Sequence, residues 1–375
     1  MEPPDAAALR ASARTFAERA VRPRAGEIDR ADRLPDGLLR DAADAGFLSL
    51  GLPPEFGGRP ASARGLSAVL EELSAASAAV AVTVAVHLSV CAQPVARFGT
   101  DPQRRAWLPS LARGERMGAF ALTEPGTGSD TAGLQTRYAA DGAGYVVRGT
   151  KTFISNAASA GLLLLFATRD PALRSRGISA FLLPAGTPGL SVGRRFEKLG
   201  LRGSETAEIH LDDVHLPPEA LLGREGEGLH IALGSLVGGR LGIASCALGV
   251  ARAALEEMRS AVRRSDAEWS RTALARAFAE YSAARALVDR AAERKDAGAP
   301  FEQEASVAKL VASRAAVSIA SAGVDIAGPP GVVGPAVAGR LLRDARVFPI
   351  VEGTSEIQEM ILGRSLLQDP DGSPT

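Results

Sequence analysis

The chain has 375 residues, which is too long for one ordinary hydrophobic core, so we expect two or three domains. Lys and Arg together number 43, as do Asp and Glu, and this balance excludes a bulk attraction to nucleic acid or to an anionic membrane. The two cysteines cannot form a disulfide framework, and neither has metal-ligand spacing to a histidine. We therefore expect a reducing compartment, taken as the cytoplasm, and no bound metal.

Residues 5 to about 112 are predicted to be helical. Leu9, Ala13 and Phe16 recur at helical spacing, and Asp101-Pro102-Gln103 is typical of a helix start. The opening residues, MEPPDAAALR, are acidic and contain proline, which is not how a signal peptide begins.

The uncharged stretch from Ala75 to Ala96 is long enough to cross a bilayer. It is built on Ala, Val, Ser and Thr and contains His87 and Gln93, so it lacks the Leu, Ile and Phe density of a lipid-facing helix. We predict a helix buried on all sides within the protein, and no membrane span.

From Met117 the pattern changes to short β-rich segments separated by glycines, which is typical of an antiparallel barrel or sandwich. These segments are 145–147, 162–167, 178–183, 190–192 and 207–211. From about Gly226 to near Leu367 the chain is again helical and rich in Ala and Leu, which predicts a helical bundle. The fold class is therefore α+β, with an all-helical domain at 1–115, a central β domain at 116–222 and a helical bundle at 223–375.

The stretch MGAFALTEPGTGSD, from Met117 to Asp130, is an apolar strand that runs into a loop of small polar residues. Glycines let backbone N–H groups approach a ligand closely, and strings of such groups hold anions. Thr, Gly, Ser and Asp also favour an ordinary tight turn. The loop alone fits a ligand site and a turn equally well.

Glu352 follows the apolar run Val347 to Val351 and stands at the start of a helix. We expect Ser355 to cap that helix, with Gln358 completing a capping box. Partial desolvation would raise the pKa of Glu352, whereas the helix N-terminus would lower it. An ordinary carboxylate favoured by the helix dipole is the alternative, and this segment alone favours it.

Five motifs in order resemble the acyl-CoA dehydrogenase family of flavoenzymes. They are MGAFALTEPGTGSD from 117, KTFISN from 151, KLGLRGSETAEIHLDDVHLP from 198, RLGIASCALGVARAAL from 240 and RDARVFPIVEGTSEIQ from 343. The likeness covers nearly the whole chain. It implies an N-terminal helical domain, a central antiparallel β-barrel domain and a C-terminal four-helix bundle.

The resemblance also implies FAD-dependent α,β-desaturation of an acyl thioester, linked to CoA or to a carrier protein, in fatty acid metabolism. Glu352 matches the family's glutamate, which takes the α-proton while the β-hydrogen leaves as hydride to flavin N5. Some members carry the base just before the arginine that matches Arg240; here that position is Gly239.

The same matches imply contacts to the cofactor and the substrate. FAD would contact Phe120, Leu122, Thr123, Gly128, Ser129, Phe153, Ile154, Ser155, Thr354 and Glu356. The substrate would contact Ser129, Arg240 and Gly353. Arg240 lies in an otherwise uncharged run, where a charge must be paired or must face a cavity.

Two segments depart from the family pattern. Residues 263–271 lack Arg-x-x-Phe-Gly-x-Pro, and Val324 to Gly331 replaces Gln-x-x-Gly-Gly, so the contacts that cross to the FAD of a neighbouring subunit are eroded. The retained Glu352 favours one hypothesis, a catalytic enzyme that is a homo- or hetero-oligomer (dimer or tetramer) with electron-transfer flavoprotein as acceptor. The eroded contacts favour the other, a non-catalytic or FAD-sharing subunit of a heteromeric acyl-CoA dehydrogenase complex. An oxygen-using flavin oxidase or monooxygenase is a third reading, which a well-placed glutamate disfavours.

Overall fold

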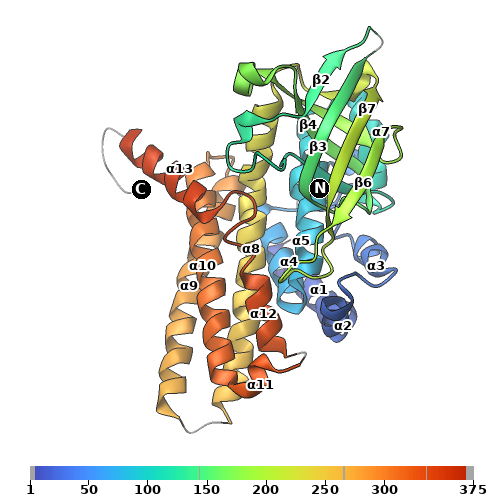
Figure 1. Cartoon of the computed structure of the whole chain (residues 1–375). Coiled ribbons are helices and arrows are strands. Elements are labelled where there is room, and N and C mark those ends of the chain that lie inside the picture. Colours follow the sequence, from blue (N-terminus) through green and yellow to red (C-terminus); the bar gives the residue numbers. More distant parts are fainter. Residues whose placement is uncertain (1–4, 143, 265–266, 335, 369–375) are drawn as a thin grey trace.

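The computed structural model describes residues 5–142, 144–264, 267–334 and 336–368. Residues 1–4, on which the expected lack of a signal peptide partly rests, and residues 265–266 of the first divergent segment lie outside the described residues. The chain forms helices, then a sheet, then helices again, in the predicted order (Figure 1). The α+β fold class is confirmed.

The N-terminal part consists of helices. They are α1 (Ala6–Phe16), α2 (Ala25–Ala31), α3 (Leu38–Asp44), α4 (Ala63–Ala76), α5 (Ala78–Ala85), α6 (Gln93–Phe98) and α7 (Asp101–Ala112). A π-helical segment, Val86–Ala92, joins α5 to α6 without a break. Thr100 and Gln103 form a capping box that starts α7.

The uncharged stretch that could span a bilayer lies in the protein core. By length and composition alone, three helices among the described residues could cross a membrane: Ala78–Phe98, Gly228–Val262 and Glu302–Ala327. In Ala78–Phe98, 94% of the apolar window is buried inside the protein. The predicted buried helix is therefore present, with Ser77 in an extended conformation separating it from α4.

The central part is one mixed sheet. Its strands are β1 (Met117–Ala121), β2 (Arg137–Ala140), β3 (Tyr145–Ser155), β4 (Ala160–Thr168), β5 (Ile178–Pro184), β6 (Leu190–Arg195), β7 (Thr206–Leu216) and β8 (Leu221–Leu222). The strand order is β6-β7-β3-β2-β4-β5-β8, and β1 pairs with β4. Most pairs are antiparallel as predicted, but β1 runs parallel to β4, and β2 meets β4 in parallel through one residue pair.

Strand β4 is buried on both faces, which explains its unbroken apolar run. Leu162, Leu164 and Phe166 belong to the large core formed with the helices. Leu163 and Leu165 point the other way, into the smaller core of the sheet. Because side chains alternate along a strand, β4 and its neighbour β5 hold the sheet against the helices.

The C-terminal part is built on three long helices, α8 (Gly228–Val262), α9 (Glu268–Asp296) and α10 (Glu302–Ala327), which pack side by side (Figure 1). The shorter α12 (Val337–Ala345) packs on α8 and α10, and α11 (Pro329–Val332) precedes it. Helix α13 (Ser355–Gln368) packs on α10. The turn between α12 and α13 carries Glu352.

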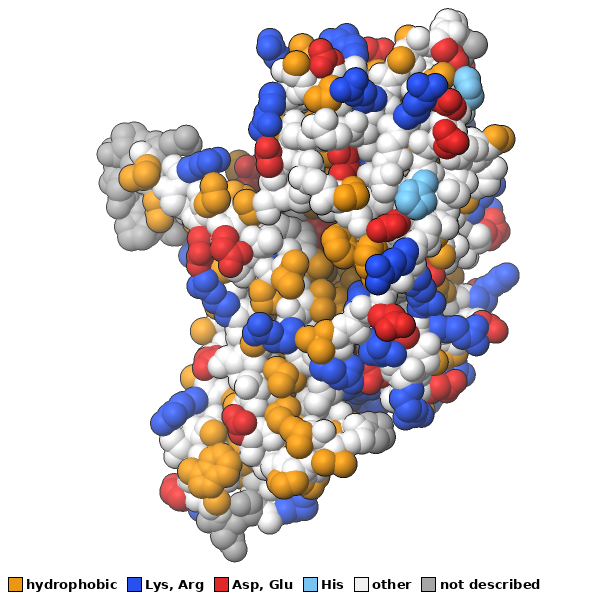
Figure 2. Space-filling model, in the orientation of Figure 1, with side chains coloured by type: hydrophobic (Ala, Val, Ile, Leu, Met, Phe, Trp, Pro, Cys, Tyr) orange, Lys and Arg blue, Asp and Glu red, His pale blue; other side chains and the backbone are white. Residues whose placement is uncertain are grey.

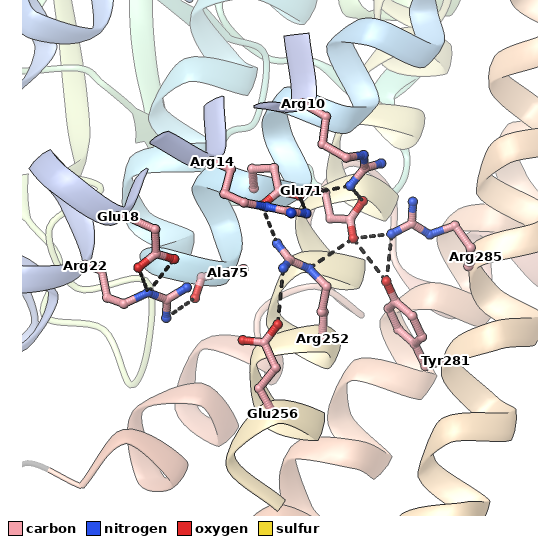
Figure 3. A network of polar contacts seen from close by, with 11 residues as sticks. Arg10, Arg14, Glu18, Arg22, Glu71, Ala75, Arg252, Glu256, Tyr281 and Arg285 are labelled. Atoms are coloured by element: carbon pink, nitrogen blue, oxygen red, sulfur yellow. Dashed lines mark hydrogen bonds and ion pairs between the residues drawn. The ribbon is translucent and has the colours of Figure 1, made fainter. Parts of the chain in front are cut away.

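Buried charges join the N-terminal helices to the bundle (Figure 3). Glu71 and Glu72 of α4 are almost fully buried. Glu72 pairs with Arg252 of α8 at 2.8 Å, and Glu71 pairs with Arg10 of α1 at 2.8 Å and with Arg285 of α9. Because each buried carboxylate has several guanidinium partners, these ion pairs hold α1, α4, α8 and α9 in register.

The loop between β6 and β7 contacts both helical parts. The Leu201 N–H donates to Asp344 Oδ1 of α12 at 2.7 Å, and the Gly203 N–H donates to Asp32 Oδ1, just after α2, at 2.7 Å. A β-carbon on Gly200 would overlap the Arg343 carbonyl. The KLGLRGS motif is therefore where the three parts of the chain meet.

Candidate active site

The loop after β1 is anchored on β3. The Thr152 N–H donates to the Thr123 carbonyl at 2.9 Å. Lys151, fully buried, donates from Nζ to the Leu122 carbonyl at 3.0 Å and to Glu124 Oε1 at 2.8 Å. Burial lowers the pKa of Lys151 to about 8, against the charge of Glu124, which raises it. This ion pair fixes the backbone on either side of Thr123.

The end of β3 presents an aromatic side chain to solvent. Phe153 has φ +57 and is 62% exposed, and its ring stacks on Phe196 with centroids 4.6 Å apart. Ile154 is buried, and Ser155 is half-buried. Asn156 donates from Nδ2 to the carbonyl of Gly118 on β1 at 3.1 Å. The predicted residues Phe120, Leu122 and Thr123 therefore lie on a segment beside Phe153, Ile154 and Ser155.

Gly128 and Ser129 lie further along the loop and are exposed. A β-carbon on Gly128 would meet nothing within 4 Å, so no packing contact explains this glycine. The neighbouring Asp130 pairs with Arg174 at 2.9 Å. The structure therefore places these two predicted residues at the surface.

Glu352 lies in a turn that closes onto α8. Glu352 has φ +56 and Gly353 has φ +91, so two consecutive residues adopt the left-handed conformation. The side chain of Glu352 extends to α8, where a β-carbon on Gly239 would lie 2.8 Å from its Cδ. The missing side chain at position 239 therefore makes the space that the Glu352 carboxylate fills.

The carboxylate of Glu352 has one oxygen that makes no hydrogen bond to the described residues. Its Oε2 is buried and accepts no hydrogen bond among the described residues. Burial raises the pKa of Glu352 to about 7, against the positive charges of Arg240 and Lys309, which lower it. Of the two opposing influences considered from the sequence, desolvation therefore prevails.

Arg240 is only 6% exposed. Its Nη1 donates to Ser306 Oγ of α10 at 3.3 Å, and its Nε is buried with no partner among the described residues. Arg240 also lines a cavity of about 1150 Å³ between the N-terminal helices, α8 and the loop from α9 to α10. Of the two possibilities expected for this charge, a charged partner or a cavity, the structure shows the cavity.

The sequence reasoning missed Lys309. This residue of α10 is fully buried, and its Nζ donates to the carbonyls of Gly353 at 2.7 Å and Pro349 at 3.3 Å. The signal that marked Arg240, a lone charge in an uncharged run, also marks Lys309 within Ala305 to Ser313. Only the fold shows that its partners lie 40 and 44 residues away.

The expected capping box at α13 is wrong. The helix starts at Ser355, and the Oγ1 of Thr354, one residue earlier, accepts from the Ile357 N–H at 3.3 Å. The Gln358 side chain instead donates to the Gly353 carbonyl at 3.0 Å. Thr354 is thus a helix cap, and Glu356 in the first helical turn is exposed.

The predicted residues lie in three places. Phe120 and Phe153 to Ser155 belong to strands of the sheet, and Leu122, Thr123, Gly128 and Ser129 lie in the loop that follows β1. Arg240 and Glu352 to Glu356 belong to the helical bundle and the turn before α13. Figure 2 shows that this face of the molecule is hollowed between the sheet and the bundle, with apolar side chains gathered in and around the hollow. Within the described ranges, no three His, Cys, Asp or Glu side chains come together as a metal site requires.

Solved structures share this arrangement of two helical parts around a sheet. The butyryl-CoA dehydrogenase of Megasphaera elsdenii matches with a TM-score of 0.95 and 34% identity, over 98% of this chain and 100% of that one. The fold is thus that of an acyl-CoA dehydrogenase.

Three family models match in order: the acyl-CoA dehydrogenase N-terminal domain over residues 3–115, the middle domain over 119–214 and the C-terminal domain over 226–367. The bovine mitochondrial short-chain specific acyl-CoA dehydrogenase is 39% identical, over 96% of this chain and 89% of its own length. An acyl-CoA dehydrogenase of Bacillus subtilis is 38% identical, over 96% of this chain and 97% of its own length. The chain belongs to the acyl-CoA dehydrogenase family.

Proposed function

We propose that this chain is an FAD-dependent acyl-thioester dehydrogenase in which Glu352 removes the α-proton of the substrate. The family membership and the short-chain relatives support the reaction class. One observation carries the assignment of the base: a buried carboxylate oxygen that has no hydrogen-bond partner among the described residues and is held in a strained turn against the bare backbone of Gly239.

The pKa of Glu352 suits a general base. A base works best when its pKa lies near the working pH, because it is then ionised yet still takes a proton readily. Burial brings the pKa to about 7, and the charges of Arg240 and Lys309 oppose a further rise. A carboxylate with a normal pKa would be ionised but a much weaker base.

The residues on the sheet fit FAD. The hydroxyls of Thr123 and Ser155 are partly exposed and donate to no other residue in the described part of the chain. Phe153 presents a large exposed ring beside them, where a flat ligand would cover it. We assign the flavin to this side, in contact with Phe120, Leu122, Thr123, Phe153, Ile154 and Ser155, and the rest of FAD to Gly128, Ser129, Thr354 and Glu356. When bound, FAD supplies the hydride acceptor.

The substrate is an acyl thioester of CoA or of a carrier protein. Arg240 lines the large cavity, and its Nε has no partner in the part of the chain that the structure describes. Gly353, next to the base, is assigned to the substrate, and the Glu352 N–H is the donor we assign to the thioester oxygen, where it would stabilise the negative charge formed on loss of the α-proton. Ser129 is assigned to the substrate as well as to FAD.

The same proposal covers the electron acceptor, the oligomeric state and the location of the enzyme. We assign electron-transfer flavoprotein as the electron acceptor. We also propose that the enzyme is a homo- or hetero-oligomer in the cytoplasm. Domain boundaries at 1–115, 116–222 and 223–375 are supported by the end of α7 at Ala112, the start of β1 at Met117 and the start of α8 at Gly228. A catalytically inactive subunit is less well supported, because such a subunit has no need of a buried, strained carboxylate.

The test uses the absorption spectrum of the pure protein. We expect a flavin spectrum, either as purified or after FAD is added, that bleaches when a panel of acyl thioesters is mixed in without oxygen. The thioester that bleaches it fastest defines the chain length. A protein that stays colourless with added FAD, or a flavin that no thioester bleaches, would contradict the proposal.

A further inference from the structure

The turn that carries Glu352 is closed by side chains from two different helices. Lys309 of α10 donates to the carbonyls of Pro349 and Gly353. Gln358 of α13 donates to the Gly353 carbonyl at 3.0 Å and to the Glu352 carbonyl at 3.5 Å. Both ends of the turn are therefore tied to one buried ammonium.

This turn needs such ties because its backbone is strained. A non-glycine residue such as Glu352 rarely adopts positive φ, and it persists there only when its surroundings enforce it. A β-carbon on Gly353 would lie 2.7 Å from Gln358 Nε2, so the turn packs too closely against Gln358 to accept a side chain at position 353. Without Lys309, the Pro349 carbonyl would keep the Ser355 N–H as a donor at 2.8 Å and the Gly353 carbonyl would keep Gln358, but no single group would join the two ends of the turn.

Lys309 differs from Gln358 in its charge. Burial lowers the pKa of Lys309 to about 8, and the charge of Glu352 raises it. The charged groups that act on Glu352 are Arg240 from α8 and Lys309 from α10. The charge of Glu302 raises the pKa of Arg240, and the charge of Glu356 on α13 raises the pKa of Lys309. Lys309 therefore has two effects: its hydrogen bonds hold the turn, and its positive charge lowers the pKa of Glu352.

We infer that Lys309 is a positioning residue for Glu352: its buried ammonium closes the Pro349 to Gly353 turn and holds the carboxylate against Gly239. Gln358 shares the geometric part of this role but not the electrostatic part. The inference rests on the proposed function, because Glu352 is the base only there. Lys309 acts through the turn and is assigned no contact with substrate.

The experiment compares Lys309→Met with Gln358→Leu in the full chain. Both remove a donor to Gly353, so amide hydrogen exchange in a peptide spanning 347–358 should become at least about 10-fold faster in each variant. Infrared titration of the Glu352 carboxyl, identified by its loss in Glu352→Gln, should show a pKa higher by roughly one unit or more in Lys309→Met. The titration in Gln358→Leu should match that of the unmodified protein.

Ser313→Ala is the matched control. Ser313 lies one turn further along α10 and donates to the Phe348 carbonyl at 3.3 Å, just outside the turn. We expect this variant to leave the Glu352 titration unchanged. If Lys309→Met does not fold, Lys309→Gln, which keeps a donor but loses the charge, takes its place in the titration.

An unchanged exchange rate together with an unchanged titration in the Lys309 variant would overturn the inference. Neither measurement uses substrate or FAD. If Glu352→Gln kept full activity while the Lys309 variants behaved as expected, the proposed function would fail but the description of the turn would stand.

Discussion

The carboxylate of Glu352 occupies the space that a side chain at position 239 would fill. A β-carbon on Gly239 would lie 2.8 Å from Glu352 Cδ and closer still to Oε2. Real β-carbons do not approach other atoms so closely. The two residues are 113 positions apart in the sequence, yet the identity of one sets the position of the other.

We therefore predict that Gly239→Ala displaces the Glu352 carboxylate and lowers kcat by roughly 10²-fold, the usual effect of moving a reacting group by about 1 Å. Steady-state turnover with the preferred thioester measures this. Gly242→Ala on the same helix is the control, since its β-carbon would meet Leu70 and Ser89 at an ordinary 3.5 Å. Equal activity in both variants would show that the carboxylate does not need its present position.

Activity should rise with pH through about 7. The substrate loses its proton to the ionised form of Glu352, and the pKa of this group is about 7 because of burial. The pH profile of kcat/KM should therefore show an acidic limb centred near that value. A limb centred near 4.5, the ordinary value for glutamate, would mean that the base is solvated in the working enzyme.

Glu352 should also reduce the stability of the protein at high pH. Its folded-state pKa of about 7 lies above the unfolded value of 4.5, so the folded state holds the proton more tightly. This stabilisation is complete below pH 4.5 and is lost as the pH rises through 7. Relative to the unmodified protein, Glu352→Gln should gain roughly 2–3 kcal/mol in free energy of unfolding between pH 4.5 and pH 8. Urea unfolding at both pH values tests this, and a constant difference would contradict it.

His87 should make the protein sensitive to acid. The ring accepts from the Gly118 N–H of β1 at 3.0 Å and contacts the Leu48 carbonyl at 3.2 Å, so it joins the sheet to the helices in its neutral form. Burial lowers the pKa of His87 to about 4, below the unfolded value of 6.5. Its contribution is complete above pH 6.5 and is lost as the pH falls through 4.

The test for His87 compares the free energy of unfolding of His87→Gln with that of the unmodified protein across pH. Asp344, whose pKa burial raises to about 6, and Glu352 change stability in the opposite direction over part of this range. These contributions cancel when His87→Gln is compared with the unmodified protein. We expect the unmodified protein to lose up to roughly 3 kcal/mol more than the variant between pH 6.5 and 4. Parallel unfolding curves at all pH values would show that His87 does not titrate in this way.

The pair Lys151 and Glu124 should stabilise the loop at Thr123. Lys151→Met leaves the buried Glu124 charge without its ammonium, and the expected cost is roughly 3–5 kcal/mol of unfolding free energy. Adding Glu124→Gln removes the uncompensated charge and should recover part of that loss. Chemical denaturation of the single and double variants measures both effects. A double variant as unstable as Lys151→Met would show that packing, not charge, accounts for the loss.

Local patterns predicted much of this fold. The helical stretches, the change to β-rich segments at Met117 and the return to helices near Gly226 depend on residues close in sequence. The parallel pairing of β1 with β4 could not be found in this way, because it joins segments 43 residues apart at Met117 and Ala160. Strand β2 was missed because its four residues are mostly exposed and carry no apolar alternation.

At the candidate site, the sequence identified Glu352 and Arg240 but not what holds them. The resemblance marked Glu352, and its position before a helix left the pKa undecided. Burial raises the pKa of Glu352, and Oε2 has no partner within the described ranges; both depend on the tertiary structure. The same holds for Lys309, whose role is visible only once α10 lies beside the turn.

The most direct test of the central claim is the rate of flavin bleaching in Glu352→Gln. Protein loaded with FAD is mixed rapidly with the preferred thioester at pH 8, without oxygen, and compared with the unmodified protein. We predict the same resting flavin spectrum and a bleaching rate lower by at least roughly 10²–10⁴-fold, the usual contribution of a general base. Bleaching at the unmodified rate would show that another group takes the proton.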